Sequence, residues 1–304
     1  MLRDKERFRF QFRECFTTFS KNGRQSPVEL AILFIIGTFA GVLAGLFGIG
    51  GGLLFTPVFY ILFTLQGVAD PVSWTIGTSL FCTFTASLGS SFQQFRQSSF
   101  YLREGFFVGI FGSAGVYGGK SVVTAHWFSE EIFVTLFVLL LLLVSLLYWM
   151  RSRPYAAEAR SRADENPLGN TGPGLSGAFV TGGAGGFVAA LAGVGGGVVM
   201  VPIMNLWIGI RLARAVSISS AAIVLISLSG WLQFALLVQP AAGVSGLVLG
   251  AVNFGAALPV VAGAFLGGMG GVLLGRIANP RLLRAGFALF AVVVAVVMIT
   301  RLLQ

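Results

Sequence analysis

Acidic residues are missing from the last part of this chain. All 11 Asp and Glu residues lie at or before Glu165, whereas residues 166–304 still carry six arginines. Only 10% of the 304 residues are charged and 56% are hydrophobic, against roughly 25% charged in a soluble domain. These shortages exclude a large soluble core and indicate a protein that crosses a bilayer several times. The net charge of +9 then fits basic loops that set membrane topology, and we expect no nucleic-acid partner.

Groups suited to catalysis or metal binding are also scarce. The single histidine, His126, lies in a loop beside Trp127, and the two cysteines, Cys15 and Cys82, have no metal or redox spacing. No nucleophile, histidine and acid form a catalytic set, so we expect no enzyme activity, no cofactor and no metal. No carboxylate falls inside an apolar run, which argues against a cation pump and favours an anion as substrate.

Composition divides the chain into four parts. They are a basic aromatic N-terminal tail at 1–27, a membrane region at 28–150, a polar linker at 151–175 and a second membrane region at 176–304. The tail lacks the apolar stretch of a cleavable signal peptide, and it suits either an interfacial anchor or a cytoplasmic tail that sets orientation. Each membrane region holds about four to five apolar segments, which predicts an all-α polytopic protein whose partner is the lipid bilayer.

One glycine motif occurs at equivalent places in the two membrane regions. The first copy runs from Gly48 to Pro57 and the second from Gly193 to Pro202, an offset of 193 − 48 = 145 residues. A hydroxyl-rich segment and a run of closely spaced glycines recur after it, in the same order. We infer an internal duplication that makes the membrane regions two tandem homologous repeats.

The clustered glycines and the proline predict a broken or re-entrant helix in each repeat. In hydrocarbon, irregular backbone is tolerated only against protein or a water-filled cavity. Matching breaks in two halves of a transporter indicate its binding site. The charges of the loops in the first half also predict such a helix. The basic tail and the basic loop at 93–104 should be cytoplasmic and the weakly charged loop at 66–73 outside, so only an odd number of crossings fits between the tail and that loop. One of the two apolar runs between them should therefore not cross fully. The relative orientation of the two repeats stays open.

Backbone N–H groups at the breaks and nearby hydroxyls are the candidate ligands for an anion. The candidate substrate-binding residues are Gly48, Gly50, Gly51, Gly52, Pro57, Thr78, Ser79, Gly193, Gly195, Gly196, Gly197, Pro202, Ser217, Ser219 and Ser220. Two alternatives stand beside this interpretation: glycines can serve close helix packing, and hydroxyls can bond to carbonyls of their own helix. Arg211 and Arg214 could draw an anion to the mouth, although their positions favour a role in topology.

The same residues carry a family resemblance. The doubled G-x-G-G-G-x-x-x-x-P at 48–57 and 193–202 resembles the sulfite exporter TauE/SafE family of membrane permeases. The segments Gly77-Thr78-Ser79 and Ile218-Ser219-Ser220 and the glycine-rich helices at 112–119 and 264–271 share in the resemblance, which covers residues 28–150 and 176–303. It implies transport of a small sulfur-containing or organic anion, such as sulfite or sulfoacetate, across a bacterial cytoplasmic (inner) membrane.

These observations favour a secondary transporter, or permease, that moves a small anion by alternating access. Two alternatives remain open at this point. The same broken helices could frame an anion channel, or the protein could be a membrane sensor or scaffold that transports nothing. The sequence does not identify the substrate, the coupling ion, the direction of transport or the oligomeric state.

Overall fold

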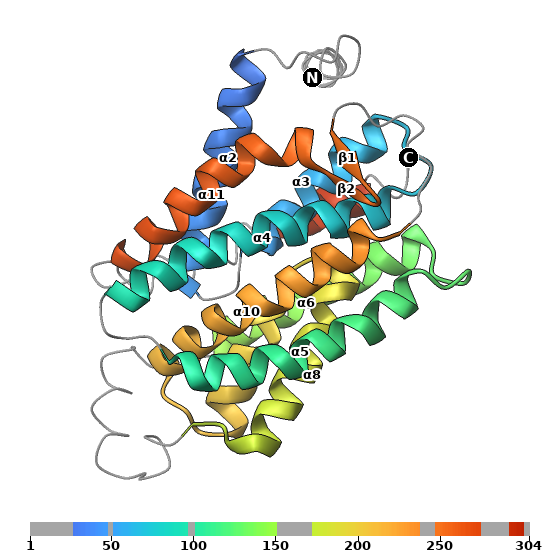
Figure 1. Ribbon diagram of the computed structural model, residues 1–304. Helices are drawn as coiled ribbons and strands as arrows, with labels where there is room; N and C mark the ends of the chain where they lie inside the picture. Colours follow the sequence, from blue (N-terminus) through green and yellow to red (C-terminus); the bar gives the residue numbers. More distant parts are fainter. Residues whose placement is uncertain are drawn as a thin grey trace.

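A computed structural model describes residues 27–47, 51–96, 101–150, 172–237, 247–274 and 292–300, and the chain is mostly helical there (Figure 1). The helices are α2 (Pro27–Phe47), α3 (Gly52–Leu65), α4 (Pro71–Arg96), α5 (Leu102–Val123), α6 (Glu130–Met150), α8 (Gly174–Ala192), α9 (Gly197–Pro202), α10 (Leu212–Ala235) and α11 (Phe254–Leu274). The tail at 1–27 and the linker at 151–175 fall almost entirely outside the described residues, and the last two residues of the predicted linker belong to α8.

Two short elements interrupt this helical pattern. Pro202 ends α9, and the next five residues, Ile203–Trp207, wind as a π-helical turn. Proline cannot donate a backbone hydrogen bond and crowds the preceding turn, which favours such a change of winding. Strands β1 (Val248–Leu249) and β2 (Val252–Asn253) form an antiparallel hairpin before α11. The hairpin was not predicted from the sequence.

Four described helices, α5, α8, α10 and α11, are long and apolar enough to cross a membrane by length and composition. Large apolar side chains also point outwards around the molecule, where a water-soluble protein would carry polar ones. Examples are Ile35, Phe39, Leu139, Phe179 and Leu266, each more than half exposed. Extended apolar surface of this kind is typical of contact with lipid. The protein is therefore a multi-pass, helical membrane protein.

Helices α2 and α11 are in backbone contact along their length. The glycines that face carbonyl oxygens of the other helix are Gly37, Gly41 and Gly45 on α2 and Gly263, Gly267 and Gly271 on α11. A Cβ at any of these positions would collide with the partner's main chain, so only glycine permits this approach. Close approach of this kind stabilises helix pairs in lipid, where no hydrophobic effect drives them together.

Helices α5 and α8 form a second pair that is also packed through glycines. Gly115 and Gly119 of α5 face carbonyl oxygens of α8, and Gly182 and Gly186 of α8 face carbonyl oxygens of α5. Helix packing therefore accounts for the glycine-rich segment at 112–119. Each of the two pairs joins a helix from the first half of the chain to one from the second half, so the halves interlock.

Helices α4 and α10 run diagonally between the two glycine-packed pairs (Figure 1). They are antiparallel, since Leu80 of α4 lies against Gly230 near the end of α10, whereas Gln94 bonds to Ser220 near its start. Helix α3 covers another face of α4 through buried aromatic rings, with the Phe63 and Trp74 centroids 6.2 Å apart. Helix α4 is thus enclosed on several sides.

Candidate functional site

The first copy of the glycine motif lies where the chain folds back on itself. Helix α2 ends at Phe47 and α3 begins at Gly52, and Gly51 between them has a φ of 73°. A Cβ on Gly51 would lie 3.1 Å from the carbonyl oxygen of Ala40, so α3 starts beside the middle of α2. Candidate residues Gly48 and Gly50 lie outside the described residues.

The second copy contains a complete break within the described part of the chain. Helix α8 ends at Ala192, and α9 begins at Gly197. Between them Gly193, Gly195 and Gly196 have φ values of 69°, 76° and 78°, a left-handed conformation that other residues adopt only with strain. Gly196 lies against the backbone of Gly185, just as Gly51 lies against Ala40 in the first copy. In both cases the contact is with the residue 11 positions earlier (196 − 185 and 51 − 40).

The two copies of the motif meet inside the protein. A Cβ added to Gly52, the first residue of α3, would overlap the Cα of Val194 and lie 2.6 Å from the carbonyl oxygen of Gly193. Gly52 is fully buried, and so are Gly193 and Val194. Backbone therefore touches backbone at this point, 193 − 52 = 141 residues apart in sequence.

Two hydroxyls hold the breaks together. Ser79 of α4 donates a hydrogen bond of 2.8 Å to the carbonyl oxygen of Gly193. Thr56 of α3 donates one of 2.9 Å to the carbonyl oxygen of Ala192 and lies 3.0 Å from the Ser79 hydroxyl. These carbonyls at the end of α8 have no successor in the helix to pair with them. The hydroxyls thus replace the missing helical hydrogen bonds and fasten three elements at one point.

Gly195 occupies the other side of the second break. A Cβ there would lie 2.6 Å from Cγ2 of Thr83 on α4 and 3.0 Å from Cγ2 of Ile223 on α10. Ser227 of α10 is the next neighbour, at 3.7 Å, and its hydroxyl donates to the carbonyl oxygen of Ile223. The break therefore lies between α4 and α10 and contacts both helices.

The remaining candidate residues divide into two places. Pro57 is buried in α3, within two turns of Gly52, and Pro202 ends α9. Thr78 accepts a hydrogen bond from the backbone N–H of Asn253 and so holds the β hairpin.

Ser217, Ser219 and Ser220 lie near the start of α10. Ser219 donates to the carbonyl oxygen of Val216, the local bonding that was one of the two alternatives for these hydroxyls. Ser220 accepts from Gln94. It lies seven residues before Ser227, about 10 Å along the helix, so it does not join the Ser79 cluster.

Every fully buried polar side chain in the described residues is neutral: the group consists of Ser, Thr, Asn and Gln. Four of these hydroxyls on α4, those of Thr75, Thr83, Ser87 and Ser91, have no hydrogen-bond partner within the described chain. Sequence reasoning missed them because it selected hydroxyls by their match between repeats. Together with Ser79 they recur every four residues along α4, and this spacing was the available signal.

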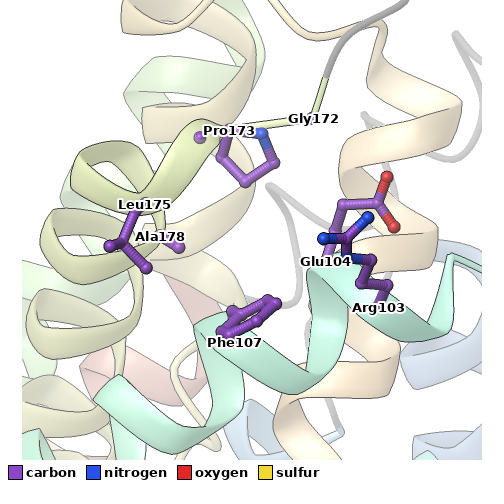
Figure 2. Close-up of a pocket in the computed structure, with 8 residues that line it drawn as sticks. Arg103, Glu104, Phe107, Gly172, Pro173, Leu175 and Ala178 are labelled. Atoms are coloured by element: carbon purple, nitrogen blue, oxygen red, sulfur yellow. The ribbon is translucent and has the colours of Figure 1, made fainter.

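An ion pair lies at one end of the bundle. Arg214 of α10 forms an ion pair of 2.9 Å with Glu104 of α5, and its guanidinium lies 4.5 Å from the ring centre of Tyr101. Arg103 and Glu104 line a pocket of about 410 Å³ (Figure 2). Its opposite wall is formed by Gly172, Pro173 and the first turns of α8. Arg214 thus links the two halves of the chain beside a cavity.

A second cavity of about 350 Å³ lies at the other end of α5. It is lined by Asp70, Ser73, His126 and Glu130, among others. The Glu130 carboxylate accepts a hydrogen bond of 2.6 Å from the hydroxyl of Tyr60. Because α5 starts beside the first cavity and ends beside the second, the two are separated by about 30 Å, the thickness of a bilayer core.

Comparisons with known proteins agree with these features. The family model for the sulfite exporter TauE/SafE matches residues 33–298. A probable membrane transporter protein of Methanocaldococcus jannaschii is 30% identical over 205 residues, which cover 67% of this chain and 72% of that protein. The probable membrane transporter protein YunE of Bacillus subtilis is 29% identical over 267 residues, 82% of this chain and 89% of YunE. No solved structure matches the chain.

Proposed function

This chain belongs to the sulfite exporter TauE/SafE family, and on that premise we propose that it is a secondary transporter for a small anion. The substrate class is a sulfur-containing or organic anion such as sulfite or sulfoacetate. It would be carried by alternating access across the cytoplasmic membrane of a bacterium. Its family and its relatives, named as membrane transporters, already support a membrane transporter that is not an enzyme.

One observation carries the proposal: the two glycine breaks touch each other at Gly52 and Val194. Irregular backbone inside a membrane protein is tolerated where it is buried in protein or lines a cavity, and transporters use such breaks to bind substrate. Separation of α3 and α4 from the break would release the hydroxyls of Thr56 and Ser79 from the carbonyls that they now hold. Those hydroxyls, with N–H groups of the freed backbone, are donors suited to the oxygens of an anion.

The closed centre favours a carrier over a channel. Cavities lie at the two ends of α5, whereas the meeting point of the breaks leaves no space even for a methyl group. Alternating access requires a closed centre between two openings, and each half-cycle would open one of them. With an inside-negative membrane potential, exit of an anion gains about 2.3 kcal/mol per charge per 100 mV, so export needs no separate coupling ion.

The test is flux of sulfite and sulfoacetate in proteoliposomes, for the wild type, Gly195→Leu and Gly270→Leu. Leucine at Gly195 would collide with Thr83 and Ile223, whereas a Cβ at Gly270 has open space around it. We expect saturable flux for the wild type and Gly270→Leu and loss of flux for Gly195→Leu, with all three proteins monodisperse after purification. Absence of anion flux in a folded wild type would overturn the proposal, and near-diffusive single-channel currents would replace it with a channel.

A further inference from the structure

Helix α4 carries a row of hydroxyls at one constant spacing. The row consists of Thr75, Ser79, Thr83, Ser87 and Ser91, each four residues after the one before. Residues four apart on a helix lie above one another with a turn of about 40° per step, so the row spirals slowly around α4. It extends about 24 Å along the axis, most of the thickness of a hydrocarbon core.

The hydroxyls of this row differ from other hydroxyls on the same helix. Thr85 and Ser90, outside the row, donate to the carbonyl oxygens of Cys82 and Ser87. This local bonding is the usual state of a hydroxyl in an apolar helix. In the row, only Ser79 has a partner, and Thr75, Thr83, Ser87 and Ser91 have none in the described chain although each is at least 93% buried.

A buried hydroxyl without a partner destabilises a protein by about 1–3 kcal/mol, and alanine would avoid that loss. Four such residues in one row on a buried helix therefore indicate a partner that enters from outside. The surroundings of the row provide none that is charged, because every fully buried polar side chain described is neutral. A ligand on this row would meet hydroxyls and amides only.

Helix α10 packs against the second half of the row. The amide nitrogen of Gln94, three residues beyond Ser91, lies 3.2 Å from the Ser220 hydroxyl. Ser227 of α10 and Thr83 of the row both border Gly195 in the second break. Beyond Ser220, Arg214 lies six residues nearer the start of α10, about 9 Å along the axis. At the other end, Ser73 lines the cavity with Asp70 and His126, two residues before Thr75.

We propose that the α4 hydroxyl row is the path of the substrate. This inference rests on the proposed transport function and adds the residues of the path to it. The Ser79–Gly193 bond closes the path one step from its Thr75 end, and Thr83, Ser87 and Ser91 lie between that closure and Gln94.

Cysteine accessibility tests the path without any assumption about transport. In a background with Cys15→Ser and Cys82→Ala, the variants Thr83→Cys, Ser87→Cys and Ser91→Cys are treated with an anionic methanethiosulfonate reagent. Ser90→Cys is the matched control, because Ser90 lies on the same helix and its backbone faces Gly268 of α11. A thiol in dry, apolar surroundings is unreactive, whereas one on a wet path ionises and reacts.

We expect the three row cysteines to react at least about tenfold faster than Ser90→Cys, a difference of about 1.4 kcal/mol in activation free energy. Equal rates at all four positions would overturn the path, even if the protein transports anions. Rapid labelling in a protein that shows no anion flux would leave the path standing and overturn the proposed function instead.

Transport tests the same row. We expect Ser87→Ala to lower sulfite flux more than Ser90→Ala does, because only the Ser87 hydroxyl belongs to the row, whereas the Ser90 hydroxyl bonds within its own helix. Equal flux of the two variants would overturn the path.

Discussion

Glycine acts in two different ways in the outer helix pairs and in the central breaks. In α5 and α8, glycines such as Gly186 belong to regular helices and face carbonyl oxygens of the other helix. In the second break, Gly193, Gly195 and Gly196 have positive φ and end one helix before the next begins. The first set lets the helices approach, and the second set turns the chain. Only the second set interrupts backbone hydrogen bonding and so offers polar groups to a ligand.

The comparison predicts the largest loss of stability for a glycine of the helix pairs. In Gly186→Leu the side chain would collide with the backbone of Gly112, so α5 and α8 would have to separate. We expect destabilisation of about 3 kcal/mol or more, at the upper end of overpacking effects. Gly183→Leu, one turn earlier on the same helix, is the control because a Cβ there has open space. Thermal unfolding in detergent measures both, and equal stability of the two variants would contradict the packing interpretation.

A glycine of the break should affect transport more than folding. Gly195→Ala introduces a Cβ in left-handed backbone, at a strain of about 1–2 kcal/mol, and brings it 2.6 Å from Cγ2 of Thr83. We expect the flux of sulfite or sulfoacetate to fall at least about tenfold.

Thr83→Ser removes Cγ2, the atom that the new Cβ would meet, and keeps the hydroxyl. In the double variant Gly195→Ala with Thr83→Ser we therefore expect part of the lost flux to return, because the effects of residues in contact are not additive. A double variant no better than Gly195→Ala would mean that strain at the break, rather than the contact with α4, limits transport.

The position of the breaks could be predicted from the sequence, whereas the partners of each helix could not. Clustered glycines followed by proline indicate where a helix must end, because the conformation they permit is local. Spaced small residues such as those of α11 indicate close packing but do not say against which helix, so the α2–α11 and α5–α8 pairs emerge only in the structure. The internal duplication stays a prediction.

The hydroxyls illustrate the same limit within the candidate site. Ser79 was selected by its match to Ser220, yet what it does depends on Thr56 and on the carbonyl of Gly193, 114 residues away in sequence. Ser220 instead bonds to Gln94 at the other end of α4. Long-range contacts of this kind leave no local pattern in the chain.

The hydrogen bond from Ser79 to Gly193 should contribute less to stability than the glycine packing of the helix pairs. In Ser79→Ala the carbonyl oxygen of Gly193 loses its donor inside the protein, which costs about 1–3 kcal/mol. Ser90→Ala is the matched control, because it removes a hydroxyl that bonds only within its own helix. We expect a lower midpoint of thermal unfolding and altered flux for Ser79→Ala alone. Identical behaviour of the two variants would show that the hydroxyl does not hold the break.

The smallest effect should come from the ion pair at the end of the bundle. Glu104→Gln removes one charge from the pair with Arg214, which joins α5 to α10 and thus the two halves of the chain. Glu104 remains 26% exposed, so water screens the pair and its loss should cost about 1 kcal/mol or less. Salt distinguishes an electrostatic effect from a packing effect. If the charge matters, the difference in unfolding midpoint between wild type and variant should shrink as ionic strength rises. A difference that does not depend on salt would mean that Glu104 acts through its packing against Gly172, since packing is not screened.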